Sequence, residues 1–143
     1  VVVVSNFRRS LLRLERHLRA EQVATTLLTG STPPARRMAI VRALNAPGAP
    51  GAPVLLLSSK AGGLGLNLVG ANRLVLLDPD WNPANDAQAM ARVWREGQAK
   101  EVFIYRLVLG GTVEEKICQR QQAKDDLCSV PFDGAGFGAA GVR

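Results

Sequence analysis

Short apolar runs alternate along the chain with longer segments in which apolar residues recur every three or four positions. The runs are rich in valine and leucine and are typical of buried β-strands, whereas the longer segments are typical of amphipathic helices. Alternating strands and helices predict an α/β fold with a mainly parallel β-sheet flanked by helices. The predicted strands are residues 1–4, 23–28, 54–57, 74–77 and 102–107.

The first predicted helix has one apolar face and one arginine-rich face. The spacing of its apolar residues places them on one side, which predicts a helix lying on the sheet, while the arginines form a solvated face. The residues of the apolar face are Phe7, Leu11, Leu14 and Leu18.

Hydroxyl residues and prolines mark where the later helices begin. Ser31 and Thr32 precede two prolines that a first helical turn tolerates, so we expect a hydroxyl to cap a helix that ends near residue 44. Pro83 starts a further helix after Asn82. Thr112 opens the last predicted helix with a capping-box pattern, and this helix runs to about residue 127.

The stretch DAQAMARVWREGQ, residues 86–98, carries three polar side chains on one predicted helical stripe. Gln88, Arg92 and Arg95 are four and three residues apart, so they lie within about 60° of one another on a helix. Paired guanidinium groups suit the charge of a transferring phosphoryl group. Alternatively, the arginines are solvated or pair with nearby acids. The apolar face expected to pack this helix consists of Ala87, Ala91 and Trp94.

A polar, glycine-rich loop follows the third predicted strand and leads into a short helix. Its sequence, SSKAGGLGLNL at residues 58–68, offers hydroxyls and open backbone N–H groups for a phosphate, although such a loop can also be only a tight connection. Walker A is excluded because no Gly-Lys pair occurs in the chain, and the dinucleotide fingerprint fails because Leu68 stands where a third glycine belongs.

Two acids follow the fourth predicted strand. Asp78 and Asp80 stand where an acid could hold Mg²⁺, but without Walker A there is no nucleotide for that metal to bridge. We therefore expect both acids to shape the loop before Trp81, and we expect no metal site in the chain itself.

The composition favours a folded domain with an anionic partner. The chain has 143 residues, 47% of them hydrophobic, which is enough for one domain with its own core. Its net charge of +6, from 18 Lys and Arg against 12 Asp and Glu, favours nucleic acid. No apolar run approaches the roughly 20 residues of a membrane span. Because the chain starts without Met inside a valine run, we expect it to begin within a longer polypeptide.

Five stretches, taken in order, resemble the second RecA-like lobe of the Swi/Snf-family DNA translocases, which belong to helicase superfamily two. The resemblance covers about residues 1–127 and implies a RecA-like lobe, the helicase C-terminal domain. The sequence RVWREGQ, with Trp94 where many members carry histidine, is most similar to members that act in recombinational repair. The five stretches are VVVVSNFRRSLL, LLTGSTPPARR, LLLSSKAGGLGLNLVGANRLVLLDPDWNP, DAQAMARVWREGQ and IYRLVLGGTVEEKICQRQQAKDDL.

This resemblance implies roles for individual residues. Arg92 and Arg95 would reach the γ-phosphate of ATP bound on the first lobe, and Gln88 would help to sense it. Gly65 and Asn67, in the glycine-rich stretch, would lie near the nucleotide. Other positions would contact the DNA backbone or face the tracked strand; they are Ser31, Thr32, Arg36 or Arg37, Ser58, Ser59, Lys60, Trp81 and Asn82.

Two departures limit the resemblance. Thr29 stands where the family usually has aspartate before Gly30. The chain also contains no Walker A lysine and no Asp-Glu motif, which the first lobe carries together with most of the Mg²⁺-ATP site. We therefore expect the chain alone not to hydrolyse ATP.

The resulting interpretation has two units. Residues 1–128 form the RecA-like lobe, and residues 129–143 form a Gly- and Ala-rich tail that we expect to be disordered. We expect a nuclear, ATP-dependent translocase on double-stranded DNA that works with its first lobe and acts on a strand-exchange recombinase filament or on nucleosomes. The alternatives are a non-catalytic basic DNA-binding module and, last, a small Rossmann-type enzyme.

Overall fold

The computed structural model describes residues 1–46 and 53–128 and has a five-stranded parallel sheet at its centre. The strand order is β2-β3-β1-β4-β5, and every neighbouring pair is parallel. The predicted α/β fold is therefore confirmed. The strands are β1 (Val2–Ser5), β2 (Thr25–Leu28), β3 (Val54–Ser58), β4 (Arg73–Leu76) and β5 (Phe103–Arg106).

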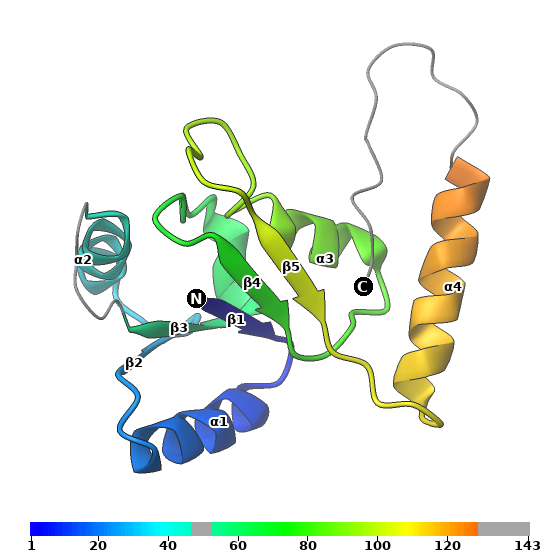
Figure 1. Ribbon diagram of the computed structural model, residues 1–143, viewed down its shortest axis with the longest axis horizontal. Helices are drawn as coiled ribbons and strands as arrows, with labels where there is room; N and C mark the ends of the chain where they lie inside the picture. Colours follow the sequence, from blue (N-terminus) through cyan, green and yellow to red (C-terminus); the bar gives the residue numbers. More distant parts are fainter. Residues whose placement is uncertain (47–52, 129–143) are drawn as a thin grey trace.

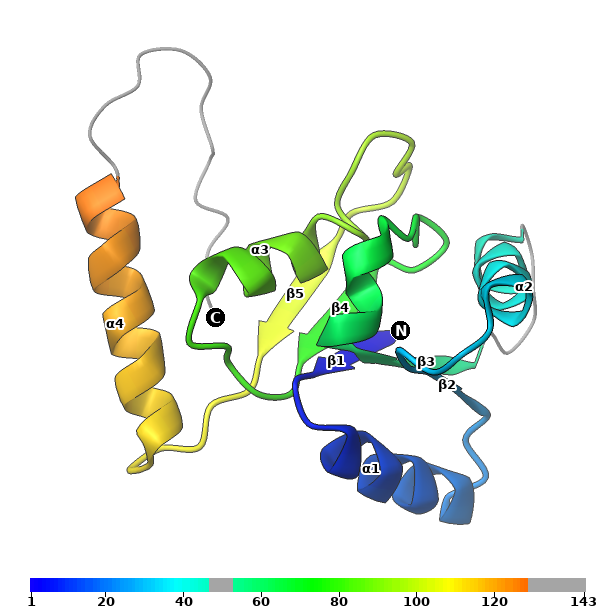
Figure 2. The same ribbon diagram turned by 180° about the vertical axis from the view of Figure 1, so that it is seen from behind.

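Helices cover both faces of the sheet, as Figures 1 and 2 show. One face carries α1, and the opposite face carries α2, η1 and α3. The last helix, α4, stands beside the carboxyl-terminal end of β5 rather than on the sheet (Figure 1). The bounds are α1 (Arg8–Ala20), α2 (Pro34–Asn45), the 3-10 helix η1 (Ser59–Leu64), α3 (Pro83–Met90) and α4 (Val113–Cys128).

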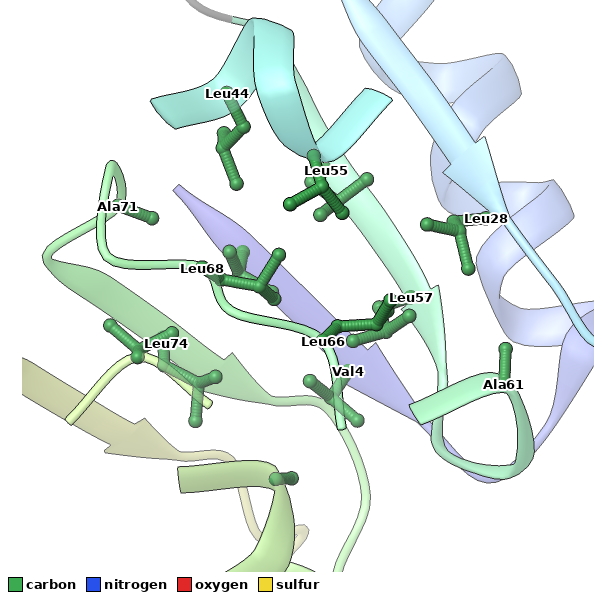
Figure 3. Packing of buried hydrophobic residues seen from close by; sticks show 14 of the residues in the cluster. Val4, Leu28, Leu44, Leu55, Leu57, Ala61, Leu66, Leu68, Ala71 and Leu74 are labelled. Atoms are coloured by element: carbon green, nitrogen blue, oxygen red, sulfur yellow. The ribbon is translucent and has the colours of Figure 1, made fainter. Parts of the chain in front are cut away.

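The alternation of side chains along the strands divides the core into two clusters. Val2 and Val4 of β1 point to the larger cluster, under α2, η1 and α3, whereas Val3 points to the smaller one under α1. Figure 3 shows the larger cluster, where Leu55 and Leu57 of β3 meet the leucines of the segment that follows η1. A central strand that is apolar on both faces explains the four-valine run.

A close backbone approach fixes the connection between η1 and β4. A Cβ on Gly70 would lie 2.1 Å from the carbonyl oxygen of Leu44, so only glycine fits there. The end of α2 also holds this segment through Asn45, whose side chain donates to the carbonyl of Asn67 and accepts from the N–H of Gly70. These contacts place the glycine-rich segment against α2.

The predicted arginine helix is shorter than expected, because α3 ends at Met90 and residues 91–97 form turns. The prediction of a continuous helix over residues 86–98 is therefore wrong. Other partners occupy the carbonyls that a continued helix would use: the N–H of Leu68 donates to the carbonyl of Arg92, and the side chain of Gln98, five residues further on, donates to that of Val93. Gly97, at φ 92°, then turns the chain toward β5.

The side chains that pack α3 also differ from the prediction. Ala87, Ala91 and Trp94 are exposed, and the residues that enter the core are Ala89 and Val93. The apolar stripe that spacing indicated therefore faces outward, and the side of α3 with Asp86 and Ala89 faces the core.

Two details of the other helices also correct the sequence analysis. The N-cap of α2 is Pro33 and makes no side-chain cap bond, because the hydroxyl of Thr32 accepts instead from the N–H of Thr29. Phe7 is 61% exposed at the start of α1, whereas Leu11 is buried as predicted. At α4, Thr112 accepts from the N–H of Glu114, so the predicted hydroxyl cap forms. Glu115 accepts from the N–H of Gly111, one residue before the position that a capping box requires.

The predicted tail at residues 129–143 lies outside the described residues. Within the described part of the chain, no helix is long and apolar enough to cross a membrane.

Candidate functional site

The carboxyl ends of the parallel strands meet at one edge of the sheet, and this edge contains a cavity of about 710 Å³. The chain leaves β1 into α1 on one face, but it leaves β3 and β4 toward η1 and α3 on the other. A crevice opens at such a change of direction, which is where open α/β sheets bind their ligands. Among the predicted site residues, the cavity is lined by Ser59, Lys60, Trp81, Gln88 and Arg92.

Arg92 is the buried cation of this cavity. Its side chain is 8% exposed, and burial together with the neighbouring charge of Arg95 lowers the pKa of its guanidinium group. Across residues 1–46 and 53–128 the structure gives this guanidinium no ion pair with a carboxylate. The acids that line the same cavity, Asp78, Asp80 and Glu114, accept hydrogen bonds from backbone N–H groups. A partly desolvated cation that lines a cavity without a paired carboxylate is suited to bind an anion.

Arg95 lies outside the cavity lining. It is exposed in the turns that follow α3, and the electrostatic effect on Arg92 places the two guanidinium groups near each other. Gln88 is exposed on α3 and lines the cavity. The structure therefore brings together Gln88 and Arg92 of the predicted stripe and leaves Arg95 at its edge.

The backbone of the glycine-rich segment is hydrogen-bonded to the turns at residues 91–97, which contain Arg92. Gly65 ends η1 at φ 65°, in the left-handed region that favours glycine. The next residues run past α3, where the N–H of Leu68 donates to the carbonyl of Arg92 at 3.0 Å. Asn67 is exposed beside this bond and does not line the cavity.

Asp78 ties the end of β4 to the end of β1. Its carboxylate accepts from the hydroxyl of Ser5 and, at 2.8 Å, from the N–H of Asn6. Asp80 accepts from the N–H of Asn82 at 2.8 Å. The expectation that both acids shape the loop is confirmed.

The loop shaped by these acids, residues 78–82, presents an aromatic side chain at the cavity. Trp81 is 63% exposed there. Asn82 accepts from the N–H of Ala84 and so caps α3, which explains why that helix begins at Pro83. One of the predicted DNA-facing residues thus also fixes the helix that carries Gln88.

The turn after β2, residues 29–32, is a second group of predicted DNA contacts and does not line this cavity. Ser31 is exposed, and its hydroxyl bonds to that of Thr29 at 2.9 Å, so the turn forms with threonine in place of the family's aspartate. Arg36 is exposed on α2. Arg37 is instead buried and donates to the carbonyl of Thr32 at 2.9 Å, so it stabilises the turn from within the protein.

The predicted contacts after β3 differ in accessibility. Ser58 is buried as the last residue of β3, Ser59 is half-buried, and Lys60 is exposed. Only the last two line the cavity.

A buried polar cluster at the start of α3 was not predicted from the sequence. Asp86 and Gln121 are both buried, and the amide of Gln121 donates to the Asp86 carboxylate at 3.0 Å. Burial raises the pKa of Asp86, against the lowering effects of hydrogen bonds from Gln121 and Asp80. Nothing in the spacing distinguishes Gln121 from its exposed neighbours Gln119 and Gln122, because burial depends on where α4 packs.

The sequence and the fold match a known class of domain. Residues 1–97 match the family described as the helicase conserved C-terminal domain. The chain therefore belongs to this family and is a RecA-like lobe of the Swi/Snf type. A crystal structure titled the C-terminal part of the Fun30 ATPase domain superposes with a TM-score of 0.77 and 37% identity, covering 82% of this chain and 37% of that one.

The relatives that the chain matches include proteins named for DNA repair and for chromatin remodelling. The chain is 53% identical over 133 residues to the human DNA repair and recombination protein RAD54-like, covering 93% of this chain and 18% of the relative. It is 52% identical over 130 residues to Protein CHROMATIN REMODELING 25 of Arabidopsis thaliana, covering 91% of this chain and 14% of that protein. The chain thus spans less than a fifth of the length of these relatives.

Proposed function

We propose that this chain is the second motor lobe of an ATP-dependent translocase on double-stranded DNA, acting in homologous-recombination repair or chromatin remodelling. The observation that carries the proposal is the Arg92 guanidinium, buried at a crevice with no carboxylate partner among the described residues. The lobe supplies this cation and Gln88, and the first lobe of the same protein supplies the Walker A and Asp-Glu groups with most of the Mg²⁺-ATP site.

Closure of the two lobes is the coupling step of this proposal. It brings Arg92 and Arg95 to the γ-phosphate, where they stabilise the charge of the transferring phosphoryl group. A trans-acting arginine of this kind contributes about 10³ to 10⁵ in rate. Gly65 and Asn67 lie on the segment bonded to the Arg92 carbonyl, which supports a place near the nucleotide.

Two groups of residues would hold the DNA backbone. The first is the turn with Ser31 and Thr32, next to Arg36, and the second comprises the strand ends with Ser58, Ser59 and Lys60 and the loop with Trp81 and Asn82. Hydroxyl, amide and lysine contacts to phosphate position a protein without reading sequence, as translocation along any duplex requires. The recombinase filament or nucleosome partners and the nuclear location are part of the same proposal.

The test is arginine substitution in the full-length protein. Arg92→Ala and Arg95→Ala should each lower DNA-stimulated ATP hydrolysis by about 10³ or more, with duplex binding retained. Arg16→Ala, on the exposed face of α1, is the matched control. Near-normal turnover in both site variants would overturn the proposal.

The basic DNA-binding module predicts a different result. If the lobe only binds DNA, both arginine variants should leave ATP hydrolysis unchanged while losing duplex affinity. A salt titration supplies a second measurement, because backbone contacts weaken steeply as salt rises.

A further inference from the structure

The buried cluster around Gln121 joins three elements that are far apart in the sequence. Gln121 of α4 is 2% exposed, and its Nε2 donates to the carbonyl of Asp80 at 2.6 Å and to Asp86 Oδ2 at 3.0 Å. Its Oε1 accepts from Arg106 of β5 at 3.5 Å. Every polar atom of the side chain thus has a partner, each outside α4.

The two acceptors belong to two parts of the candidate site, the loop after β4 and the start of α3. Asp80 belongs to the loop that presents Trp81, which we propose faces DNA. Asp86 lies in the first turn of α3, the helix that carries Gln88 and leads to Arg92. The N–H of Asp80 also donates to Asp86 Oδ2, at 3.4 Å. The loop and the helix are therefore linked both directly and through the side-chain amide of Gln121.

We propose that Gln121 is a positioning residue that couples the DNA-facing loop to the ATP-facing helix. A displacement of the loop at Asp80 is passed through the Gln121 amide to Asp86 and hence to the orientation of Gln88 and Arg92. This inference rests on the proposed function and adds the residue through which duplex binding stimulates ATP hydrolysis.

The neighbourhood of Asp86 determines how substitutions will act. Among the side chains that the structure describes, the charged and titratable groups that face it are Asp80 from the loop, Arg106 from β5 and the Cys118 thiol from α4. Of these only Arg106 is positive, so a second carboxyl at position 121 would meet Asp86 with little compensation and would share a proton with it.

The experiment compares two neighbouring glutamines of α4 in the full-length protein. Gln121→Glu removes both amide donors, and the ratio of DNA-stimulated to basal ATP hydrolysis should fall about tenfold at pH 8. The ratio should recover in part at pH 6, as the introduced carboxyl and Asp86 take up a proton. Gln122→Glu is the matched control, because this exposed side chain should leave the ratio and its pH profile unchanged.

Gln121→Met separates coupling from titration. Methionine is of similar length and cannot titrate, so the ratio should fall at every pH while duplex affinity stays near that of the parent protein. The melting temperature should also fall, because the Asp80 carbonyl and the Asp86 carboxylate each lose a hydrogen bond, and the assays are therefore run well below it. A ratio within twofold of the parent in both Gln121 variants, with a flat pH profile, would overturn the inference. Equal losses of basal and DNA-stimulated hydrolysis in Gln121→Met would also overturn it, because the residue would then be only structural.

Arg92→Ala in the same assays keeps the two proposals distinguishable. If Arg92→Ala loses hydrolysis with and without DNA while the Gln121 variants behave like the parent, only the coupling inference fails. Normal hydrolysis in Arg92→Ala would overturn the proposed function itself.

Discussion

The two loops that we propose contact DNA differ in what holds them. The turn at residues 29–32 is held by its own neighbours: the N–H of Thr29 donates to the hydroxyl of Thr32 at 3.0 Å, and Arg37 donates to the Thr32 carbonyl. The loop at residues 78–82 is held from a distance, by Ser5 of β1 through Asp78 and by Gln121 of α4 through the Asp80 carbonyl.

This difference separates a fixed contact from a responsive one. A turn whose partners are all within a few residues keeps its shape whatever the rest of the molecule does. A loop whose partners lie on β1, α3 and α4 changes when those elements move. We therefore expect the turn after β2 to keep the same conformation and the same contact with DNA throughout. We expect the loop after β4 to change conformation when the elements around it move.

The largest effect on this comparison is expected from Arg37→Met. It removes a buried guanidinium that donates to the carbonyls of Thr32 and Gly30, so the turn should lose about 2 to 3 kcal/mol of local stability. Hydrogen exchange of the peptide that spans the turn should rise accordingly, with the loop at residues 78–82 unchanged. Arg36→Met, at the exposed neighbour, is the control and should stay within about 0.5 kcal/mol. Equal changes in both loops would contradict the local character of the turn.

A smaller effect is expected from Asp86→Asn, which sharpens the account of the distant loop. Burial raises the pKa of Asp86, so the folded protein binds the proton more tightly than the unfolded chain. The stabilising contribution of the protonated form is present at about pH 4 and is lost as the pH rises through the raised pKa. The parent should therefore lose stability relative to Asp86→Asn as the pH rises.

Thermal melts of both proteins from pH 4 to pH 8 measure this difference. A difference that does not vary with pH, or that grows in the opposite direction, would contradict the burial of the carboxyl group.

The smallest effect is expected from Thr32→Val. Valine keeps the shape but removes the hydroxyl that accepts from the N–H of Thr29, which should cost about 1 kcal/mol. The change should appear as faster exchange of the Thr29 amide alone. Thr32→Ser retains the hydroxyl and should exchange like the parent. Should Thr32→Val also speed exchange at residues 78–82, the two loops would not be independent.

Strand and helix positions were predictable because they depend on local patterns. The apolar runs gave all five strands to within about two residues, and the prolines gave the starts of α2 and α3. The helix after Pro83 was predicted too long, because its end depends on the N–H of Leu68, which approaches from the segment after η1, and on the side chain of Gln98, which turns back from five residues further on. Spacing along one segment carries no information about such partners.

The candidate site was predictable to the same degree. Gln88 and Arg92 were identified from their spacing and do line one cavity, together with Ser59, Lys60 and Trp81. The roles of Arg37 and Gln121 were not predictable, because each has equivalent residues beside it in the sequence. Only tertiary packing decides that Arg37 is buried and Arg36 exposed.

The position of β1 has a consequence for how the lobe folds. This strand lies at the centre of the sheet, where Val2 is opposite Leu55 on one side and Leu74 on the other. During synthesis, an apolar strand that needs two partners emerges long before either of them. Sheets closed by such distant pairings form slowly and expose aggregation-prone surface meanwhile. The lobe should therefore depend on chaperone protection of its first strand until β3 and β4 have been made.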